Sequence, residues 1–297
     1  MPGFLELPHN LSRPEYSRVH VIPVPYDATS TYKKGADLGP QAIIDASAQV
    51  EWYDIETGDE HVAQGIHTQE PVVCNEDDPE YLSPLVRQRV LAALEAGRLP
   101  VVLGGEHSVS IGAIEAAALH AKNLSILQVD AHADTREEYM GSRFNHACVM
   151  ARAREHGSIV QVGIRAIDRV ELETMDADRV YFAHEIARCV RSNDASWMDR
   201  VIAQLEDIVY LTIDLDALDP SLLPATGTPE PGGLDWYTLN ELVRRVAREK
   251  TILGFDVVEL CPRPDQHASD FTAAKLVYRV ICEVLASKMG SETREKD

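Results

Sequence analysis

Acidic and histidine side chains follow four separate apolar runs of the chain. In sequence order they are His107; Asp130, His132 and Asp134; Asp214, Asp216 and Asp219; and Glu259. Carboxylates and imidazoles bind divalent cations and transfer protons. Short runs rich in Val, Ile and Leu are typical of strands buried in a parallel sheet, whose ligands bind beyond the carboxyl ends of the strands. We therefore expect these side chains to converge on one rim of a sheet.

The spacing within two of these groups places their side chains on one side of the backbone. Side chains alternate along an extended segment, so Asp130, His132 and Asp134 would point the same way. Asp214 and Asp216 have the same spacing. Carboxylates this close together must be protonated or neutralised, and a divalent cation neutralises them. The two groups are therefore candidate metal ligands.

The mixture of ligand types indicates which metal fits. Four carboxylates and two imidazoles, with His107 included, favour Mn²⁺ over Mg²⁺. Cysteine is missing from every group, which counts against a structural zinc site. Each short motif also has an ordinary interpretation, because an Asp after a strand often caps a helix and His107 could stand at a helix entry. The concurrence of several motifs at strand ends favours the metal site.

Strand-like runs alternate with helical patterns along the chain. The predicted strands are Arg18–Val24, Pro100–Leu103, Leu124–Val129, Ile159–Val162, Val180–Phe182, Ile208–Ile213 and Ile252–Val258. The predicted helices are Gly39–Gln49, Ser83–Gly97, Ser108–Lys122, Ala147–His156, Met198–Leu205, Trp236–Arg248 and Phe271–Ser287. We expect Ser83 to cap its helix and Pro84 to lie in the first turn. This alternation predicts an α/β fold, with a parallel sheet covered by helices on both faces.

Composition excludes several classes of protein. The 297 residues carry a formal net charge of −20, whereas nucleic acids and anionic membranes are bound by clustered Lys and Arg. The acidity is compatible with a small cationic ligand, with solubility or with a salt-rich intracellular habitat. The five cysteines include no CxxC pair, and neither a signal peptide nor a membrane-spanning run is present. We expect a cytoplasmic protein with no nucleic-acid or membrane partner.

No linker or repeat divides the chain. We therefore expect one domain over residues 1–297, with flexible termini at 1–17 and 290–297. The segment 227–233, which contains three glycines and two prolines, predicts a rigid loop near the candidate site. It lacks the pattern of a phosphate-binding loop, and a purely structural role is the simpler interpretation.

Three segments resemble the signature segments of the ureohydrolase family, which includes arginase and agmatinase: GGEHS at 104–108, DAHAD at 130–134 and DLDALDPSLLPATGTPEPGG at 214–233. The early segment YKKGADLGPQAI resembles the family's helix start at Gly39 and Pro40. The resemblance extends from about Val19 to Ile281. It implies a three-layer α/β/α fold with a parallel, eight-stranded sheet, one strand more than the apolar runs predict. It also implies a homotrimer or homohexamer.

Carried over position by position, the resemblance implies two Mn²⁺ ions per chain. One ion would be held by His107, Asp130, Asp134 and Asp214, and the other by Asp130, His132, Asp214 and Asp216. The same resemblance pairs Glu259 with the guanidinium of the substrate. His146, in the NHAC segment, matches the position of a proton-shuttling histidine. Otherwise Glu259 would be a solvated acid, and His146 a polar residue at a helix start.

These roles suit the hydrolysis of a guanidinium, which is a poor electrophile because resonance spreads its charge. Two ions that share one water lower its pKa toward neutrality, which supplies a strong nucleophile. We expect Asp134 to pass the proton to the leaving amine and His146 to exchange protons with solvent. Glu259 would orient the planar guanidinium through forked, charge-assisted hydrogen bonds.

The identity of the substrate depends on the segment after the DAHAD motif. Arg136 stands where arginase has an Asn, and the segment looks more like those of agmatinases and of enzymes that take aminopropyl-agmatine. Glu137 and Glu138 could face the ammonium of such substrates, or they could be surface acids. If Arg136 or Arg143 faces the pocket, a carboxylate substrate such as guanidinobutyrate becomes the alternative. We predict that agmatine is cleaved to urea and putrescine.

Two other functions remain as alternatives. One is a single-zinc hydrolase of the deacetylase type on the same fold. The joint presence of His107, Asp134 and Asp216 favours two ions instead. The other is a metal-binding scaffold without catalysis, which the presence of Glu259 and His146 disfavours.

Overall fold

Eight strands form one parallel sheet in the computed structural model, which describes the backbone of residues 3–294 and the side chains of residues 3–287. The strands are β1 Val19–Val24, β2 Ile66–Thr68, β3 Leu99–Gly104, β4 Leu124–Val129, β5 Ser158–Ile164, β6 Val180–Phe182, β7 Ile208–Asp214 and β8 Thr251–Val258. Their order across the sheet is β2-β1-β3-β8-β7-β4-β5-β6, and every neighbouring pair is parallel. The predicted α/β fold with a parallel sheet of about eight strands is confirmed.

Helices cover both faces of the sheet. They are α1 His9–Ser12, α2 Gly39–Ser47, α3 Pro79–Glu95, α4 Val109–His120, α5 Val149–Ala153, α6 Arg169–Leu172, α7 Ala183–Arg191, α8 Ser196–Gln204, α9 Trp236–Glu249 and α10 His267–Arg294. Short 3-10 helices occur at η1 Phe4–Glu6, η2 Ala36–Leu38, η3 His61–Gln64, η4 His146–Cys148, η5 Ala177–Arg179 and η6 Leu215–Ala217.

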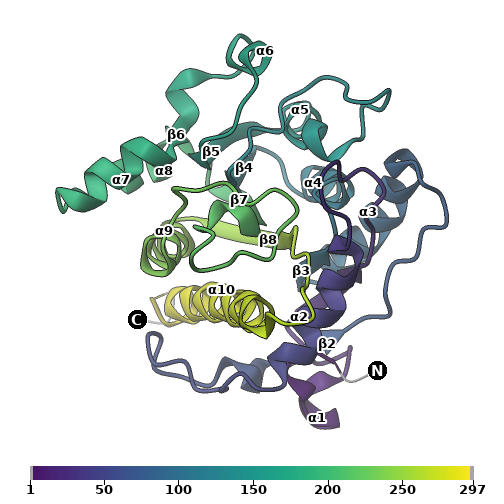
Figure 1. Ribbon diagram of the computed structural model, residues 1–297. Helices are drawn as coiled ribbons and strands as arrows, with labels where there is room; N and C mark the ends of the chain where they lie inside the picture. Colours follow the sequence, from purple (N-terminus) through teal and green to yellow (C-terminus); the bar gives the residue numbers. More distant parts are fainter. Residues whose placement is uncertain (1–2, 295–297) are drawn as a thin grey trace.

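The two faces of the sheet belong to separate apolar cores. Val21 of β1 packs in one core and the next residue, Ile22, in the other, because side chains alternate along a strand. Helices α2, α8, α9 and α10 complete the first core, and α3, α4 and α5 complete the second. Figure 1 shows α10 and α4 on opposite sides of the sheet. The central strands are buried on both faces, which explains their continuous apolar runs.

The start of α3 was placed too late from the sequence. Its first residue is Pro79, and the side chain of Asp78 caps it by accepting a hydrogen bond from the backbone N–H of Glu80. A proline fits this first turn because its nitrogen needs no partner there. Ser83 is therefore not the N-cap, and Pro84 lies inside the helix.

Two elements at the edges of the sheet were missed. Strand β2 has three residues and pairs with β1 alone, so it is too short to produce a recognisable pattern. Helix α7 follows β6 directly. Its buried residues, Ala183 and Ile186, form too narrow an apolar stripe to distinguish it from a loop.

The expectation of a flexible segment at 1–17 is wrong for much of that segment. Phe4 and Leu5 are buried in the core with α2, and Leu5 donates a backbone hydrogen bond to Ser47 Oγ at 2.7 Å. At the other end, α10 continues to Arg294, inside the tail that we expected to fray. Residues 1–2 and 295–297 lie outside the described residues.

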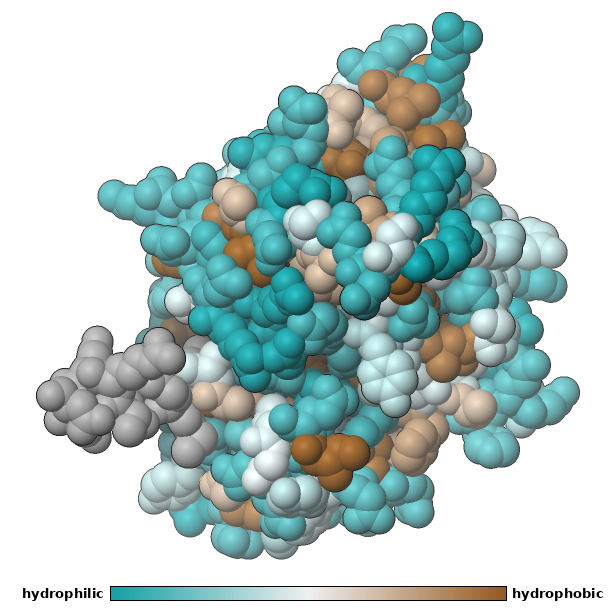
Figure 2. Space-filling view, turned by 90° about the vertical axis from the view of Figure 1, so that its left-hand side faces the viewer, coloured by the Kyte–Doolittle hydropathy of each residue, from teal (hydrophilic) through white to brown (hydrophobic). Residues whose placement is uncertain are grey.

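The outer surface agrees with the strongly acidic composition. Hydrophilic residues cover most of the face seen in Figure 2, and apolar residues form small, separate groups there. Among the helices that the structure describes, none is long and apolar enough to cross a membrane.

Candidate metal centre and active site

Four adjacent strands at the centre of the sheet deliver the candidate ligands. They are β3, β8, β7 and β4, which are neighbours in that order. All four run in the same direction, so the segments that follow them meet at one rim. His107 follows β3, Asp130 follows β4, Asp214 ends β7 and Glu259 follows β8. The predicted convergence of these side chains is found in the structure.

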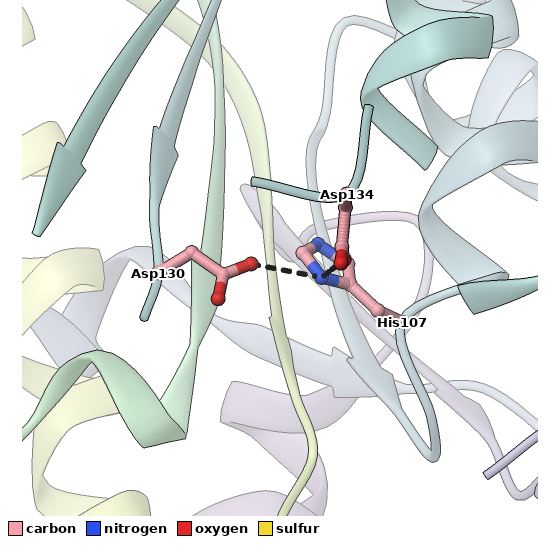
Figure 3. A group of neighbouring side chains, drawn as sticks. All are labelled: His107, Asp130 and Asp134. Atoms are coloured by element: carbon pink, nitrogen blue, oxygen red, sulfur yellow. Dashed lines mark ion pairs between the residues drawn. The ribbon is translucent and has the colours of Figure 1, made fainter. Parts of the chain in front are cut away.

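The first ligand group surrounds the imidazole of His107. Its Nδ1 lies 3.0 Å from Asp134 Oδ2 and 3.2 Å from Asp130 Oδ2, as Figure 3 shows. Asp214 Oδ2 lies 3.5 Å from the same nitrogen. Although Nδ1 is buried, it makes no hydrogen bond with any described residue. Three carboxylates are therefore grouped around one buried nitrogen, an arrangement that suits ligands of a shared cation.

The second ligand group lies on the other side of Asp130. His132 Nδ1 is 2.9 Å from Asp216 Oδ2 and 3.7 Å from Asp130 Oδ1. Ligand atoms of these three residues lie within 4.8 Å of one another, as do those of His107, Asp130 and Asp134. Asp130 belongs to both groups, with Oδ2 toward His107 and Oδ1 toward His132. This is the position expected of a carboxylate that bridges two ions.

Backbone and side-chain amides hold the carboxylates in place. Asp130 Oδ1 accepts a hydrogen bond of 2.6 Å from the backbone N–H of His132, and Asp214 Oδ1 accepts one of 2.8 Å from that of Asp216. Gln128, two residues before Asp130 on β4, donates to Asp130 Oδ2 at 2.7 Å. The ligands are thus positioned by the strand ends before any cation binds.

The pKa values in the cluster reflect the crowding of its carboxylates. Burial, followed by the neighbouring carboxylates of Asp216 and Asp134, raises the pKa of Asp130 to about 7. Burial and then Asp216 and Asp130 raise the pKa of Asp214 well above its ordinary value. Burial acts the same way on Asp216, but His132, together with hydrogen bonds from the side chain of Asp214 and from the backbone N–H of Ala131, lowers the pKa of Asp216 to about 2. A divalent cation would relieve this repulsion.

A buried chain of hydrogen bonds, the relay, holds the imidazole of His107 through its Nε2 atom. His107 Nε2 lies 2.9 Å from Thr212 Oγ1, and the Thr212 hydroxyl donates to Asp256 Oδ1 at 2.6 Å. Since the Thr212 hydroxyl donates its hydrogen to Asp256, its oxygen must accept a hydrogen bond from His107 Nε2–H. The relay therefore fixes the tautomer in which Nδ1 carries no proton and is free to bind a metal.

Two residues of the site have a left-handed backbone conformation. Asp134 has φ +52° and Glu259 has φ +68°, a region that L-residues other than Asn and Asp rarely adopt. Such a conformation costs on the order of 1–3 kcal/mol and persists only where the surrounding structure imposes it. Leu5, Glu6, Asn123, Met140 and Asn193 share this feature, so strain marks the site without being unique to it.

Glu259 lies against the first ligand group. Its backbone N–H donates to Gly105 O at 2.7 Å, and its Oε1 accepts a 2.8 Å hydrogen bond from the backbone N–H of His107. Gly105 must be glycine, because a Cβ there would lie 2.0 Å from Tyr26 O. Burial and then the Glu106 carboxylate raise the pKa of Glu259 well above its usual range. A bound cation next to Glu259 would reverse this effect.

His146 faces the same cavity and is held by a chain of polar groups. Its Nδ1 lies 3.0 Å from Thr29 Oγ1, and the Thr29 hydroxyl donates to Glu106 Oε2 at 2.9 Å. Thr29 Oγ1 must therefore accept a hydrogen bond from Nδ1–H, which leaves Nε2 to exchange protons. The Tyr139 ring packs edge-on against the imidazole at a centroid distance of 6.2 Å. Thr29 and Glu106 were not identified from the sequence, although Glu106 lies in the GGEHS motif.

A cavity of about 370 Å³ opens above the ligand groups. Among its lining residues are His132, Asp134, Asp214, Asp216, His146, Glu259, Arg136, Lys33, Asp168, Glu171 and Glu230. The last three carboxylates belong to segments that the sequence did not connect with the site. Their place in the cavity wall depends on the paths of the loops after β5 and β7, which reach the rim of the sheet.

The basic and acidic residues after the DAHAD motif are distributed differently from the expectation. Arg136 lines the cavity, but its guanidinium lies 3.4 Å from an oxygen of Asp168 and 3.8 Å from one of Glu171, and stacks over Tyr139. Its charge is thus already compensated. Arg143 pairs with Glu155 in an exposed position and does not line the cavity.

Glu137 and Glu138 are surface acids, so their alternative role opposite a substrate ammonium is wrong. Both are exposed, and neither lines the cavity. Glu137 pairs with Arg152 at 2.6 Å and with Arg154. The chain turns outward after Arg136, which a motif alone does not reveal.

Comparison with known proteins agrees with this geometry. The family model described as the Arginase family matches residues 17–282. The chain therefore belongs to the arginase family. It is 41% identical over 270 residues to the N(1)-aminopropylagmatine ureohydrolase of Thermus thermophilus, covering 90% of each chain, and 32% identical to the agmatinase of Pyrococcus horikoshii, covering 88% and 90%.

Solved structures give the same result. The agmatine ureohydrolase of Thermoplasma volcanium superposes with a TM-score of 0.86 at 31% identity, covering 98% of this chain and 96% of that one. The predicted resemblance and the predicted enzyme class, a hydrolase of guanidino compounds, are confirmed.

Proposed function

We propose that this protein is a manganese-dependent ureohydrolase that converts agmatine into urea and putrescine. The observation that carries the proposal is the buried Nδ1 of His107, which has three carboxylates within 3.5 Å and no hydrogen bond to a described residue. A second group, centred on His132 and Asp216, shares Asp130 with the first. Two cations in one cluster suit the hydrolysis of a guanidinium.

The donor set fits two Mn²⁺ ions. His107, Asp130, Asp134 and Asp214 would hold one ion, and Asp130, His132, Asp214 and Asp216 the other. Carboxylate oxygens combined with imidazole nitrogens suit manganese, and none of the five cysteines belongs to either group. When bound, the ions supply the positive charge that lowers the pKa of a water molecule toward neutrality.

The remaining residues act on the substrate. The backbone N–H of His107 holds one carboxylate oxygen of Glu259 in place. Glu259 binds the planar guanidinium of the substrate through charge-assisted hydrogen bonds. Asp134 carries a proton from the attacking water to the departing amine, since its carboxylate lines the cavity. His146 exchanges a second proton with solvent, the one released when a new water replaces the water consumed. It does so through Nε2, because Nδ1 is held by Thr29. Arg136 shapes the wall of the cavity and contributes little net charge.

The charges around the cavity favour a cationic tail on the substrate. Asp168, Glu171 and Glu230 line it, and the charge of Arg136 is compensated by the first two. Lys33 also lines the cavity, but it is exposed and its ammonium lies over the Tyr32 ring. A carboxylate tail, as in guanidinobutyrate, would face this acidic wall. N(1)-aminopropylagmatine is the second candidate, because relatives with 36–41% identity carry the name of its ureohydrolase.

Putrescine formation would place the enzyme in polyamine biosynthesis. A cytoplasmic location suits the five cysteines, all of which are free thiols in the structure. We also infer a homotrimer or homohexamer, as the family resemblance implies. Light scattering of the purified protein measures this assembly directly.

The decisive experiment compares urea release from agmatine, N(1)-aminopropylagmatine, arginine and guanidinobutyrate in the presence of Mn²⁺. One of the first two substrates should have the highest kcat/KM. Release from none of the four would favour a non-catalytic scaffold, and one tightly bound zinc per chain would favour the deacetylase-type alternative.

A further inference from the structure

The loop 227–233 passes directly over the candidate guanidinium-binding residue. A Cβ on Gly227 would lie 3.7 Å from Glu259 Oε2. Glu230 comes three residues later and lines the same cavity. Three residues span at most about 10 Å, and the guanidinium and ammonium of extended agmatine are separated by a distance on the order of 7 Å, from bonds of about 1.5 Å. The loop therefore has the reach to contact both ends of such a substrate.

Arg165, which follows β5, fixes the backbone of this loop. Its Nη2 donates to Glu230 O at 2.7 Å and to Asp216 O at 2.6 Å, and its Nε donates to Pro231 O at 3.2 Å. One guanidinium thus ties the loop to the backbone of a candidate metal ligand. Because these bonds use main-chain oxygens of Glu230 and Pro231, they position Glu230 without forming a hydrogen bond to its carboxylate, which acts on the Arg165 guanidinium only through its charge.

Asp219 fixes the far end of the loop. Its Oδ2 accepts hydrogen bonds of 2.8 Å and 3.1 Å from the backbone N–H groups of Gly232 and Gly233. Gly233 packs so closely that a Cβ would lie 2.5 Å from Asp219 N. The loop is therefore held at its middle and at its far end, on both sides of Glu230, which is presented by a preorganised backbone.

The carboxylate of Glu230 differs from the other acids of the cavity wall. Asp168 caps α6 and contacts Arg136, while Glu171 accepts hydrogen bonds from Thr135 and Asp168. Within the described residues, no hydrogen bond or ion pair engages the half-buried Glu230 side chain. It is also outside both ligand groups. An anionic group in such a position can bind a cation that enters the cavity.

We propose that Glu230 selects the substrate by binding its distal ammonium group. This inference rests on the proposed function, because it concerns the tail of the same guanidinium substrate. The ligand is a linear guanidinoalkylamine, with the guanidinium at Glu259 and the ammonium at Glu230. Neither Arg136, which is paired, nor Glu137 and Glu138, which point outward, takes this role.

The test compares wild type with Glu230→Gln on two substrates of equal length, agmatine and n-pentylguanidine, in which a methyl group replaces the ammonium. Glu138→Gln is the matched control, since it removes one exposed carboxylate near the site. Loss of a charge-assisted contact should reduce kcat/KM for agmatine by about 10- to 100-fold, mainly through KM. The rate with n-pentylguanidine should change by less than about twofold, and Glu138→Gln should match wild type on both.

Equal losses on the two substrates, or no loss on agmatine, would overturn the proposal. Calorimetric binding of 1,4-diaminobutane to the manganese-loaded protein provides a readout that does not require turnover. Wild type should bind it at least about tenfold more tightly than Glu230→Gln, and equal affinities would contradict the role of Glu230. If wild type released urea from neither guanidino compound, the proposed function would fail, while the diamine titration would still decide the role of Glu230.

Discussion

The carboxylate of Asp219 allows a quantitative test of how the loop over the site is held. Its Oδ1 accepts a hydrogen bond from the backbone N–H of Ser221, and its Oδ2 accepts those from Gly232 and Gly233. The side chain of Ser221 first, and then the backbone N–H groups of Ser221, Gly232 and Gly233, lower the pKa of Asp219 from 3.8 to about 2. In Asp219→Asn the amide group would turn its own hydrogens toward backbone donors.

The size of the effect follows from the pKa shift. A shift from 3.8 to about 2 corresponds to at most about 2.5 kcal/mol, and partial exposure of the carboxylate reduces this to about 1–2 kcal/mol. For a chain of this length we expect Asp219→Asn to lower the Tm by about 2–5 °C at pH 7. Because the folded-state pKa is depressed, the contribution is fully present above pH 3.8 and disappears as the pH falls through about 2.

Differential scanning calorimetry at pH 5 and pH 7 measures this difference. The control is Asp77→Asn, an exposed aspartate far from the loop in sequence, which should keep the wild-type Tm. Since the loop carries Glu230, Asp219→Asn should also raise the KM for agmatine while its manganese content stays the same. An unchanged Tm at both pH values would refute the conclusion that these hydrogen bonds hold the loop.

Three further predictions concern the metal centre. Asp130→Asn should lose manganese, and its kcat/KM should fall by more than about 100-fold, since even residues that only hydrogen-bond to metal ligands contribute 10- to 100-fold to affinity or activity. Metal analysis and urea release check this, and normal turnover would exclude a bridging role. Thr212→Val should weaken manganese binding by about 10- to 100-fold in a metal titration. Thr212→Ser, which keeps the hydroxyl, should bind manganese as wild type does. Equal affinities of all three proteins would show that the hydrogen bond from His107 to Thr212 does not support metal binding. Chelation should lower the Tm more at pH 8 than at pH 5. The folded-state pKa of Asp130 is raised to about 7, so the metal-free fold loses stability as the pH rises from 3.8 toward 7. A decrease in Tm on chelation that is the same at both pH values would contradict this.

Most of the fold could be predicted because buried parallel strands have a strong sequence pattern. Runs such as Leu124–Val129 and Ile208–Asp214 are apolar on both faces, so their positions were recognisable without tertiary information. The short edge strand β2 was not, because three residues give no periodicity. The start of α3 depended on the cap at Asp78, which lies within a run of acidic residues that shows no helical apolar pattern.

The candidate ligands could be predicted because each follows directly after a strand. Strand ends have a fixed place in a parallel sheet, so the positions of His107 and Asp130 followed from topology. The cavity wall could not be predicted in this way. Glu137 points outward and Glu230 points inward, and the difference arises from the path of their loops. Thr212 resembled an ordinary strand residue until its contacts with the neighbouring strands were seen.

The central claim is that the strand ends hold two cations that share the carboxylates of Asp130 and Asp214. Anomalous diffraction at the manganese edge, from crystals grown with Mn²⁺, tests this claim most directly. We predict two peaks per chain, one beside His107 and one beside His132, with Asp130 in contact with both. A single peak, or none at this rim of the sheet, would contradict the account.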